Sequence, residues 1–449
     1  MNAQQDVRTG SLPDYLAMAK PNPEENRAPW YKNIAPTYAG IFLSVPFMAG
    51  MAGGLQYGSV WAALVGLFVG ALFCFALYYV PGILGLKTGM NLYVVGSSSF
   101  GTQGGILMPG LLMGVLQIGW HAVFTMFAAN FVVQGLGIEA GFNSVTYWVI
   151  CVVWGLALAF VGAVGIGLLG ALSTYLPVLP LIAIIIAGFT NLGGISSFEA
   201  TTVASAGIPV FGLAMFATIQ AAAGFFATAG AAGADFATNS RTRKDVTLGG
   251  LVGITLAALV AGGFAILTIA GAIGNDPTIA ASDDVFGTAI AQVGSLSKII
   301  AWIFVIACIC PTGFCAFLAA NSFSTMFPKL PRVGMTMAAG TVGVVLAATG
   351  TAADLVGFFV IIGASFGPII GAMAADYLRS GKWAGPRKGI NWAGYIAWAV
   401  GFLVGILGTL PAIGFSYGLE TLMSFVVGFA VYLILADLGL EPETVELPQ

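Results

Sequence analysis

Apolar segments of about 20 residues recur along this chain from residue 34 to residue 437, and a helix of that length crosses the hydrocarbon core of a bilayer. Charged residues make up only 7% of the chain. A soluble domain has about 25%, so this chain cannot cover a water-facing surface. We therefore expect an all-α integral membrane protein. Twelve transmembrane helices are predicted at 34–58, 60–84, 106–134, 145–166, 172–192, 208–234, 247–274, 296–324, 332–350, 353–378, 391–412 and 417–437.

The positions of the basic residues predict the orientation of these helices, because cytoplasmic loops collect Lys and Arg. If the N-terminus is cytoplasmic, every basic residue except Lys298 falls in or at the edge of a cytoplasmic segment. The opposite loops carry acidic residues instead. We therefore expect a multi-pass protein of the plasma membrane with both termini in the cytoplasm. The basic segments are the N-terminal tail, 85–105, 235–246, 325–331 and 379–390.

Two predicted helices contain residues that interrupt an α-helix at a similar depth. In the first helix, Pro46 removes a backbone donor and clashes with the preceding turn, so we expect a break over 46–50. In the sixth, Thr228, Gly230 and Gly233 are expected to weaken the helix. Such breaks at matching places of two halves indicate an inverted-repeat secondary transporter that binds its substrate at the exposed backbone ends. Because Gly and Pro are common in membrane helices, either break alone is equally compatible with ordinary packing.

The two interrupted helices begin two sets of five helices, which predicts how the chain is organised. No further soluble domain is expected. The predicted parts are a cytoplasmic N-terminal tail at 1–33, a first inverted repeat at 34–192, a second inverted repeat at 208–378, helices eleven and twelve at 391–437, and an acidic cytoplasmic C-terminal tail at 438–449.

The segment LQIGWHAVF at 116–124 places polar groups inside an apolar helix and contains the only histidine of the chain. At 100° per residue, Gln117, Trp120, His121 and Phe124 share one face. Trp120 can stack on a flat ring, while Gln117 can donate and accept hydrogen bonds at its edge. This stripe indicates a neutral, planar, hydrogen-bonding solute. For His121 we favour the alternative of a helix-packing residue bonded to a neighbouring oxygen.

Several classes of function are excluded by what the sequence contains. The chain has no Walker motif, which argues against ATP-driven transport. One histidine makes a His/Cys metal cluster improbable, and no catalytic constellation is present, so we do not expect an enzyme. Asp235 and Asp376 lie at cytoplasmic helix ends beside basic residues, where capping or ion pairing explains them better than proton relay. The expected partners are a small solute, a coupling cation and lipid, with no nucleic acid.

Five motifs together resemble the nucleobase-cation symporter family, and most of all its cytosine permeases, over about residues 30–435. The resemblance implies a fold similar to the sodium-coupled leucine transporter, with a five-plus-five inverted repeat and discontinuous helices one and six. It also implies uptake of cytosine, a purine, a hydantoin or allantoin by alternating access, driven by Na⁺ or H⁺, without another cofactor. The motifs are SSSFGTQGG (97–105), LLMGVLQIGW (111–120), GFFATAGAAGADF (224–236), FGPIIGAMAADYL (366–378) and INWAGY (390–395).

The resemblance also implies a set of substrate-binding residues. Gln117 and Trp120 match the glutamine and tryptophan that bind the base, and Phe226 matches an aromatic residue below it. The chain departs from the cytosine-permease pattern at Ser44, which an ungapped reading places where those proteins have a stacking phenylalanine, and at Phe225, which replaces a serine. The implied substrate-binding residues are Gln117, Trp120, His121, Phe124, Phe225, Phe226, Thr228, Ser44 and Gly313.

A sodium site of this fold would combine the first helix with the eighth. The asparagines and paired threonines of cytosine permeases are replaced across CICPTGFCAF (308–317), where only Thr312 keeps a hydroxyl. The sodium site is therefore either weakened or completed by backbone oxygens that Pro311 frees. The missing side chains also argue against cytosine itself as the substrate. Proton coupling through His121 is an alternative to sodium coupling. The candidate ligands are Gly40, Leu43, Cys308, Pro311 and Thr312.

Two other functions are compatible with this architecture. The same fold can transport an amino acid, an amine or a small amide, but an amine normally requires a carboxylate, and no acid lies at mid-depth in helices one, three, six or eight. A passive channel can also contain broken helices. Two matched breaks fit alternating access better than a channel.

Overall fold

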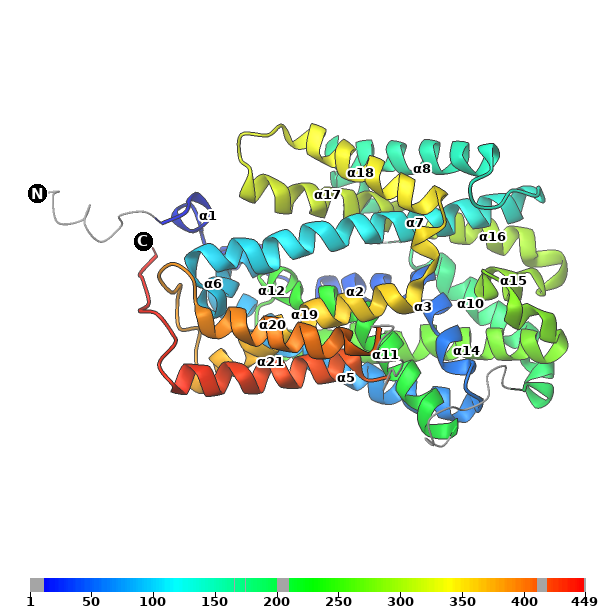
Figure 1. The fold of residues 1–449 in the computed structure, drawn as a ribbon. Helices are drawn as coiled ribbons and strands as arrows, with labels where there is room; N and C mark the ends of the chain where they lie inside the picture. The colour runs from blue at the N-terminus through cyan, green and yellow to red at the C-terminus, as the bar shows by residue number, and fades with distance from the viewer. Residues whose placement is uncertain (1–11, 165, 174, 200–209, 410–417, 448–449) are drawn as a thin grey trace, which may run out of the picture.

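The computed structural model describes residues 12–164, 166–173, 175–199, 210–409 and 418–447. Long helices run side by side along one common axis (Figure 1). Within the described residues the only β-structure is two isolated bridges, so the expected all-α architecture is confirmed.

The predicted count of twelve spans fits the helices of the structure. Among the described residues, ten helices are long and apolar enough to cross a membrane, and the bent first helix makes an eleventh. The 17-residue apolar helix α18 makes the twelfth. The predicted ends at 208–209, 410–412 and 417 lie outside the described residues. The helices from α2 onward are α2 (Ile34–Phe42), α3 (Val45–Gly50), α4 (Ala52–Leu55), α5 (Val60–Thr88), α6 (Leu92–Gly105), α7 (Leu112–Leu136), α8 (Val145–Val164), α9 (Ile166–Ser173), α10 (Val178–Asn191), α11 (Val210–Ala231), α12 (Gly233–Ala237), α13 (Arg243–Gly250), α14 (Ala257–Asn275), α15 (Val285–Ala291), α16 (Ser297–Ala307), α17 (Ile309–Met326), α18 (Arg332–Ala348), α19 (Leu355–Ser380), α20 (Trp392–Ile406) and α21 (Glu420–Asp437).

The first helix is broken, but earlier than the sequence predicts. Helix α2 ends at Phe42 and α3 begins at Val45, with a bend of 54° between them. Ser44 is extended and precedes α3, so the break lies before Pro46 and the prediction of 46–50 is wrong. Proline is tolerated in the first turn of a helix, because its missing N–H would have no partner there.

The break in the sixth helix is slighter than predicted. Helix α11 continues through Thr228 and Gly230 to Ala231, and only Ala232 separates it from α12. Gly230 lies against Leu77 of α5, with 3.2 Å between Leu77 Cβ and the Cβ that a larger residue would add. The glycines of this segment allow a close approach to α5, a role that sequence alone does not distinguish from helix breaking.

A third irregularity lies at Gly101 inside α6, in the segment that we expected to be the loop 85–105. Gly101 has φ +85° and ψ 169°, a conformation reserved for glycine. The loop between α19 and α20 fills the opening: Thr102 N–H donates to the Arg387 carbonyl at 2.7 Å, and Asn391 N–H to the Phe100 carbonyl at 3.1 Å. The predicted loop is therefore mostly helical, and its glycine serves as a docking point.

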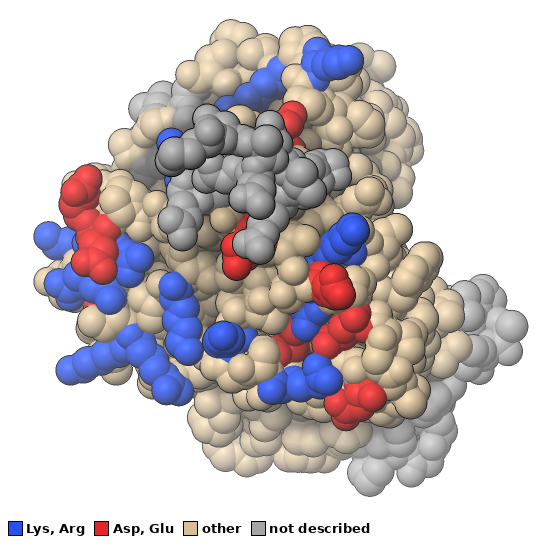
Figure 2. Space-filling model, turned by 90° about the vertical axis from the view of Figure 1, so that its left-hand side faces the viewer, with Lys and Arg blue, Asp and Glu red and all other residues tan. Residues whose placement is uncertain are grey.

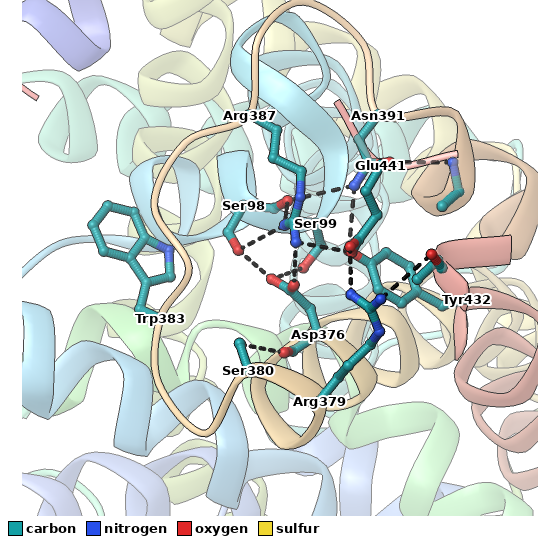
Figure 3. Close-up of polar contacts among 12 residues, drawn as sticks. Ser98, Ser99, Asp376, Arg379, Ser380, Trp383, Arg387, Asn391, Tyr432 and Glu441 are labelled. Atoms are coloured by element: carbon teal, nitrogen blue, oxygen red, sulfur yellow. Dashed lines mark hydrogen bonds and ion pairs between the residues drawn. The ribbon is translucent and has the colours of Figure 1, made fainter. Parts of the chain in front are cut away.

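A buried ionic network holds this loop to the C-terminal segment (Figure 3). The Arg387 guanidinium lies 2.9 Å from the Asp376 carboxylate and 2.8 Å from that of Glu441. Arg379 reaches Glu441 at 2.7 Å, and the Tyr432 hydroxyl donates to Glu441 at the same distance. Ser98 donates to Asp376 from α6. The interpretation of Asp376 as an ion-paired residue is confirmed.

Both ends of the described chain lie at the same end of the bundle. Helix α1 (Asp14–Ala17) and the residues that follow α21 are at the left of Figure 1. An even number of spans requires this arrangement. Figure 2 looks onto that end and shows that Lys and Arg side chains gather there.

Candidate functional site

An aromatic cluster lies where the broken first helix meets α7, α11 and α19. The Trp120 and Phe225 rings are 5.2 Å apart at 82°, an edge-to-face contact. Phe225 packs in turn against Phe47 at 5.1 Å, and Phe42 stacks on Phe226 at 5.1 Å and 15°. The cluster comprises Phe42, Phe47, Trp120, Phe124, Phe225, Phe226, Phe358 and Phe359.

Polar groups at the edge of the aromatic cluster are few and uncharged. Trp120 Nε1 donates to the Thr228 hydroxyl at 3.3 Å, which joins α7 to α11. Gln117 lies one turn earlier and is buried, and its Nε2 reaches only the weak acceptor Met113 Sδ at 3.5 Å. The Ser44 hydroxyl is buried at the break without a hydrogen-bond partner. Gln117 and Ser44 therefore keep hydrogen-bonding capacity that a bound solute can use.

His121 lies apart from the aromatic cluster, so the predicted four-residue stripe is split. Its Nδ1 is 2.9 Å from the Thr312 carbonyl of α17, and its ring packs against Gly340 and Gly343 of α18. Its Nε2 is buried without a partner. Adjacent residues of a helix differ by 100° in direction, so Trp120 and His121 face different neighbours.

Gly313 also lies away from the aromatic cluster. A Cβ on Gly313 would come within 2.5 Å of Leu169 of α9, and its carbonyl oxygen is 2.4 Å from where Gly162 of α8 would carry a Cβ. The residue thus allows α17 to pack closely on α8 and α9.

The residues of the predicted cation site lie on two helices with different neighbours. Ser44 N–H donates to the Ile41 carbonyl, which leaves the Gly40 carbonyl without its usual helical donor, and Leu43 lies at the break itself. Helix α2 packs on α13 and α14, whereas α17 packs on α7, α8 and α18. The main packing partners of the two helices therefore differ.

The eighth-helix half of that site is already engaged in hydrogen bonds. Pro311 has no N–H and cannot bond to the Ala307 carbonyl. The Thr312 hydroxyl donates to the Cys308 carbonyl at 2.6 Å and lies 3.4 Å from Trp154 Nε1. Within the described part of the chain, no three His, Cys, Asp or Glu side chains come together as a metal site.

Two neighbouring cavities lie beyond the aromatic cluster, at the end of the bundle remote from α1. The larger, here called the vestibule, has a volume of about 210 Å³ and is lined by Asn130, Asp283, Asp284 and Asp354 among others. The smaller, here called the side pocket, has about 100 Å³. The two share the lining residues Gly50, Gly53, Gln56 and Val356.

Phe359 belongs to the aromatic cluster and also lines the side pocket. Its ring lines the side pocket, lies 5.8 Å from Trp120 and rests against Gly50. Sequence reasoning missed Phe359, and it placed Ser44 where the structure has Phe42 and Phe47 in the aromatic cluster. The pair Phe358–Phe359, one turn after the N-cap Asp354 of α19, is the only local signal that marks the α19 residues.

Comparison with models of known protein families shows which family the chain belongs to. A family model described as permease for cytosine/purines, uracil, thiamine, allantoin matches residues 21–431. The chain belongs to this family. It is therefore a multi-pass membrane permease and not an enzyme, and the predicted resemblance to nucleobase-cation symporters is confirmed.

Individual relatives of this permease are distant. The cytosine permease of Escherichia coli O157:H7 is 26% identical over 348 residues, which cover 72% of this chain and 73% of the relative. The cytosine permease of Escherichia coli strain K12 is 25% identical over 348 residues, which again cover 72% of this chain and 73% of the relative.

Solved structures confirm the fold of the permease. The inward-facing structure of the transporter Mhp1 has a TM-score of 0.76 at 15% identity and covers 96% of this chain and 95% of its own. The closed structure of Mhp1, a nucleobase-cation-symport-1 family transporter with bromovinylhydantoin bound, has a TM-score of 0.72 at 15% identity. The match covers 95% of this chain and 96% of that structure. A Na⁺-coupled sialic acid symporter has a TM-score of 0.57 at 13% identity, and the match covers 97% of this chain and 93% of the symporter.

Proposed function

We propose that this permease imports a neutral nucleobase or a related nitrogen heterocycle, coupled to Na⁺ or H⁺, by alternating access. The observation that carries the proposal is the aromatic cluster around Trp120, edged by the uncharged groups of Gln117, Ser44 and Thr228. Aromatic faces suit a planar ring, and an amide and hydroxyls suit its N–H and C=O groups. Neither the aromatic cluster nor these edge groups carry a charge, which disfavours amino acids and amines.

We further propose that the end of the bundle carrying α1 faces the cytoplasm. The basic residues that gather there support this orientation, since Lys and Arg are enriched in cytoplasmic loops (Figure 2). The vestibule then opens outward. For the coupling ion, the carbonyls at the break of the first helix remain the best candidates, because the last turn of a helix lacks internal donors.

Uptake into proteoliposomes tests the proposed function. Radiolabelled cytosine, uracil, hypoxanthine, hydantoin and allantoin are each offered with an inward Na⁺ gradient, an inward H⁺ gradient or neither. We expect saturable uptake of at least one compound, stimulated by one of the two gradients. Absence of uptake for all five under every gradient contradicts the proposal, and uptake unaffected by either gradient contradicts coupling.

A pair of tryptophan variants separates a site effect from a general one. Trp120→Ala removes the centre of the aromatic cluster, and we expect uptake to fall to background. Trp61→Ala is the matched control, because Trp61 is 70% exposed on the outer surface of the bundle. Equal loss of uptake in both variants would contradict a specific role for Trp120.

A further inference from the structure

Two basic side chains at the end of the bundle that carries α1 are each held on a tyrosine. Lys87, in the last turn of α5, donates from Nζ to the Tyr377 hydroxyl of α19 at 2.7 Å and lies 5.0 Å from the centre of that ring. Arg243, the first residue of α13, donates from Nε to the Tyr79 hydroxyl of α5 at 2.9 Å, and its guanidinium lies 5.8 Å from that ring centre. Arg243 also interacts electrostatically with Tyr377, so the two pairs form one group, here called the basic site.

The two cations of the basic site are not neutralised by the protein. Within the described part of the chain, neither Lys87 nor Arg243 forms an ion pair, whereas the neighbouring Arg241 pairs with Asp245 at 3.5 Å. Both side chains are exposed. Lys87 keeps two of its three N–H donors, and Arg243 keeps both terminal nitrogens. The basic site therefore presents positive charge and unused donors at the end of the bundle where Lys and Arg gather (Figure 2).

The basic site lies at the level where three apolar spans end. Helices α5 and α19 are each apolar enough to cross a membrane, and α13 begins a third such span. Lys87, Arg243 and Tyr377 all lie in the terminal turns of these helices. Tyrosine is enriched at the boundary between membrane and water, where its ring is in apolar surroundings and its hydroxyl meets the lipid headgroups. We therefore expect the basic site to face the headgroups of one leaflet.

An exposed apolar surface continues from the basic site towards the middle of the spans. Leu72, Phe75 and Tyr79 share one face of α5, because spacings of three and four residues match the helical repeat. Phe75 packs on Tyr79 at 5.5 Å and rests against Gly250, which closes the space between α5 and α13. Leu72 is 43% exposed, and Leu251, the next residue after Gly250, is 40% exposed. This surface suits an acyl chain.

We propose that the basic site binds the phosphodiester headgroup of an anionic phospholipid, whose acyl chain lies along this apolar surface. Lys87 and Arg243 donate charged hydrogen bonds to the phosphate oxygens, and the Tyr377 hydroxyl, which accepts from Lys87, donates its own proton. Two cations without an acidic partner disfavour a zwitterionic headgroup, because its ammonium would be repelled. A free phosphate would leave the apolar surface unused. The bound lipid joins α5 and α13 to α19, and the proposal does not depend on the transported solute.

Retention of radiolabelled phosphatidylglycerol by the immobilised, detergent-purified full chain tests the proposal. Unlabelled phosphatidylglycerol and phosphatidylcholine are the competitors. In the wild type, we expect phosphatidylglycerol to compete at a concentration at least about tenfold lower than phosphatidylcholine. In Lys87→Gln/Arg243→Gln this preference should disappear. Absence of specific retention by the wild type, or an equal preference in the variant, overturns the proposal.

Lys329→Gln/Arg332→Gln is the matched control for the double variant. Lys329 and Arg332 are exposed and lie at the start of α18, outside α5, α13 and α19. The Arg332 guanidinium also lies over a ring, 4.4 Å from the centre of Phe317. The control therefore removes the same two charges and one cation–π contact. We expect it to keep the preference for phosphatidylglycerol; loss in both variants would show attraction to net charge alone and overturn the site.

Two further arms distinguish a lipid from a free anion and test the tyrosine. Inorganic phosphate in large excess should not displace phosphatidylglycerol, and displacement would show a site for a free anion and overturn the lipid. Tyr377→Phe keeps the ring beside Lys87 but removes the hydroxyl, so we expect retention to weaken about 2- to 10-fold. Unchanged retention in Tyr377→Phe would contradict the assigned geometry. Melting curves in lipid-free detergent check that each variant is folded.

Discussion

Two interactions of Trp120 determine its place in the permease, and they are separable. Its ring packs edge-to-face on Phe225, and its indole N–H donates to Thr228. The first interaction depends on the shape of the aromatic cluster and the second on one hydroxyl. A variant that removes only the hydroxyl therefore reports on the polar interaction alone.

We predict that Thr228→Val weakens substrate binding modestly and that Trp120→Ala abolishes it. A neutral hydrogen bond contributes about 0.5–1.5 kcal/mol, so a change of about 2- to 10-fold in the dissociation constant is expected for Thr228→Val. Equilibrium dialysis measures both variants. Loss of binding in Thr228→Val as complete as in Trp120→Ala would show that the hydroxyl, not the ring, dominates.

Asp235 provides a prediction on pH. Its carboxylate accepts from Leu92 N–H at 2.8 Å at the junction of α12 and α6, outside the apolar spans. Burial raises the pKa of Asp235 from 3.8 to about 6, although the Leu92 N–H lowers it. The native state therefore binds this proton more tightly than the unfolded state. The resulting stability is fully present below about pH 4 and is lost as the pH rises through 6.

Asp235→Asn should remove this dependence, because the amide oxygen still accepts from Leu92 N–H but does not titrate. Between pH 4 and pH 7, we expect the free energy of unfolding of the wild type to fall by at most about 3 kcal/mol relative to the variant. Melting curves of both proteins over this pH range provide the measurement. Parallel pH profiles would contradict the assignment.

Among the helices, glycine and proline have different consequences at different positions. Pro46 lies in the first turn of α3 instead of breaking a helix, and Gly230 brings α11 onto α5 without interrupting it. Gly101 interrupts α6 and is the point where the loop before α20 docks. The same residue type therefore starts, packs or opens a helix, and its neighbours in space decide which.

Gly101→Ala is predicted to destabilise the permease by about 1–3 kcal/mol, because its backbone conformation is disallowed for alanine. The added Cβ would also lie 2.3 Å from the Gly389 carbonyl oxygen. Gly381→Ala is the control, since Gly381 also has a positive φ of 67° but no atom within 4 Å of the added Cβ. Thermal unfolding should show a clearly larger effect at Gly101; equal effects would mean that the contact with Gly389 adds nothing.

Over the whole molecule, the ionic network ties four distant parts of the chain together at one end of the bundle. Asp376 lies near the C-terminal end of α19, Arg387 lies in the following loop, Glu441 follows α21, and Ser98 belongs to α6 (Figure 3). The side chains of Arg387 and Asp376 are each only 6% exposed. In such a place an unpaired charge is far more costly than the pair.

Arg387→Met should destabilise the fold by about 3–5 kcal/mol, because it leaves the buried Asp376 carboxylate without its cation, whereas Glu441 keeps Arg379. Arg379→Met is expected to cost less than about 1 kcal/mol, since the Arg379 side chain is 39% exposed. Thermal unfolding of the purified variants measures both. Adding Asp376→Asn to Arg387→Met should restore part of the stability; no restoration would contradict the ionic origin of the loss.

The sequence by itself determined the class of the protein, the number of spans and the family resemblance, and it supplied candidate residues for the site. Apolar length and the placement of Lys and Arg are local properties that lipid and water act on directly, so these predictions needed no knowledge of packing. The sequence also predicted Trp120 and Phe225 as site residues from motifs in continuous segments, and the structure places their rings in contact. Only the tertiary structure decided that His121 packs against α18 and that Phe359 joins the aromatic cluster. It also decided that Gln220 and Glu420 line the same cavity. These pairs come from helices far apart in the chain, and which side chains meet depends on how the helices pack, which no local pattern encodes.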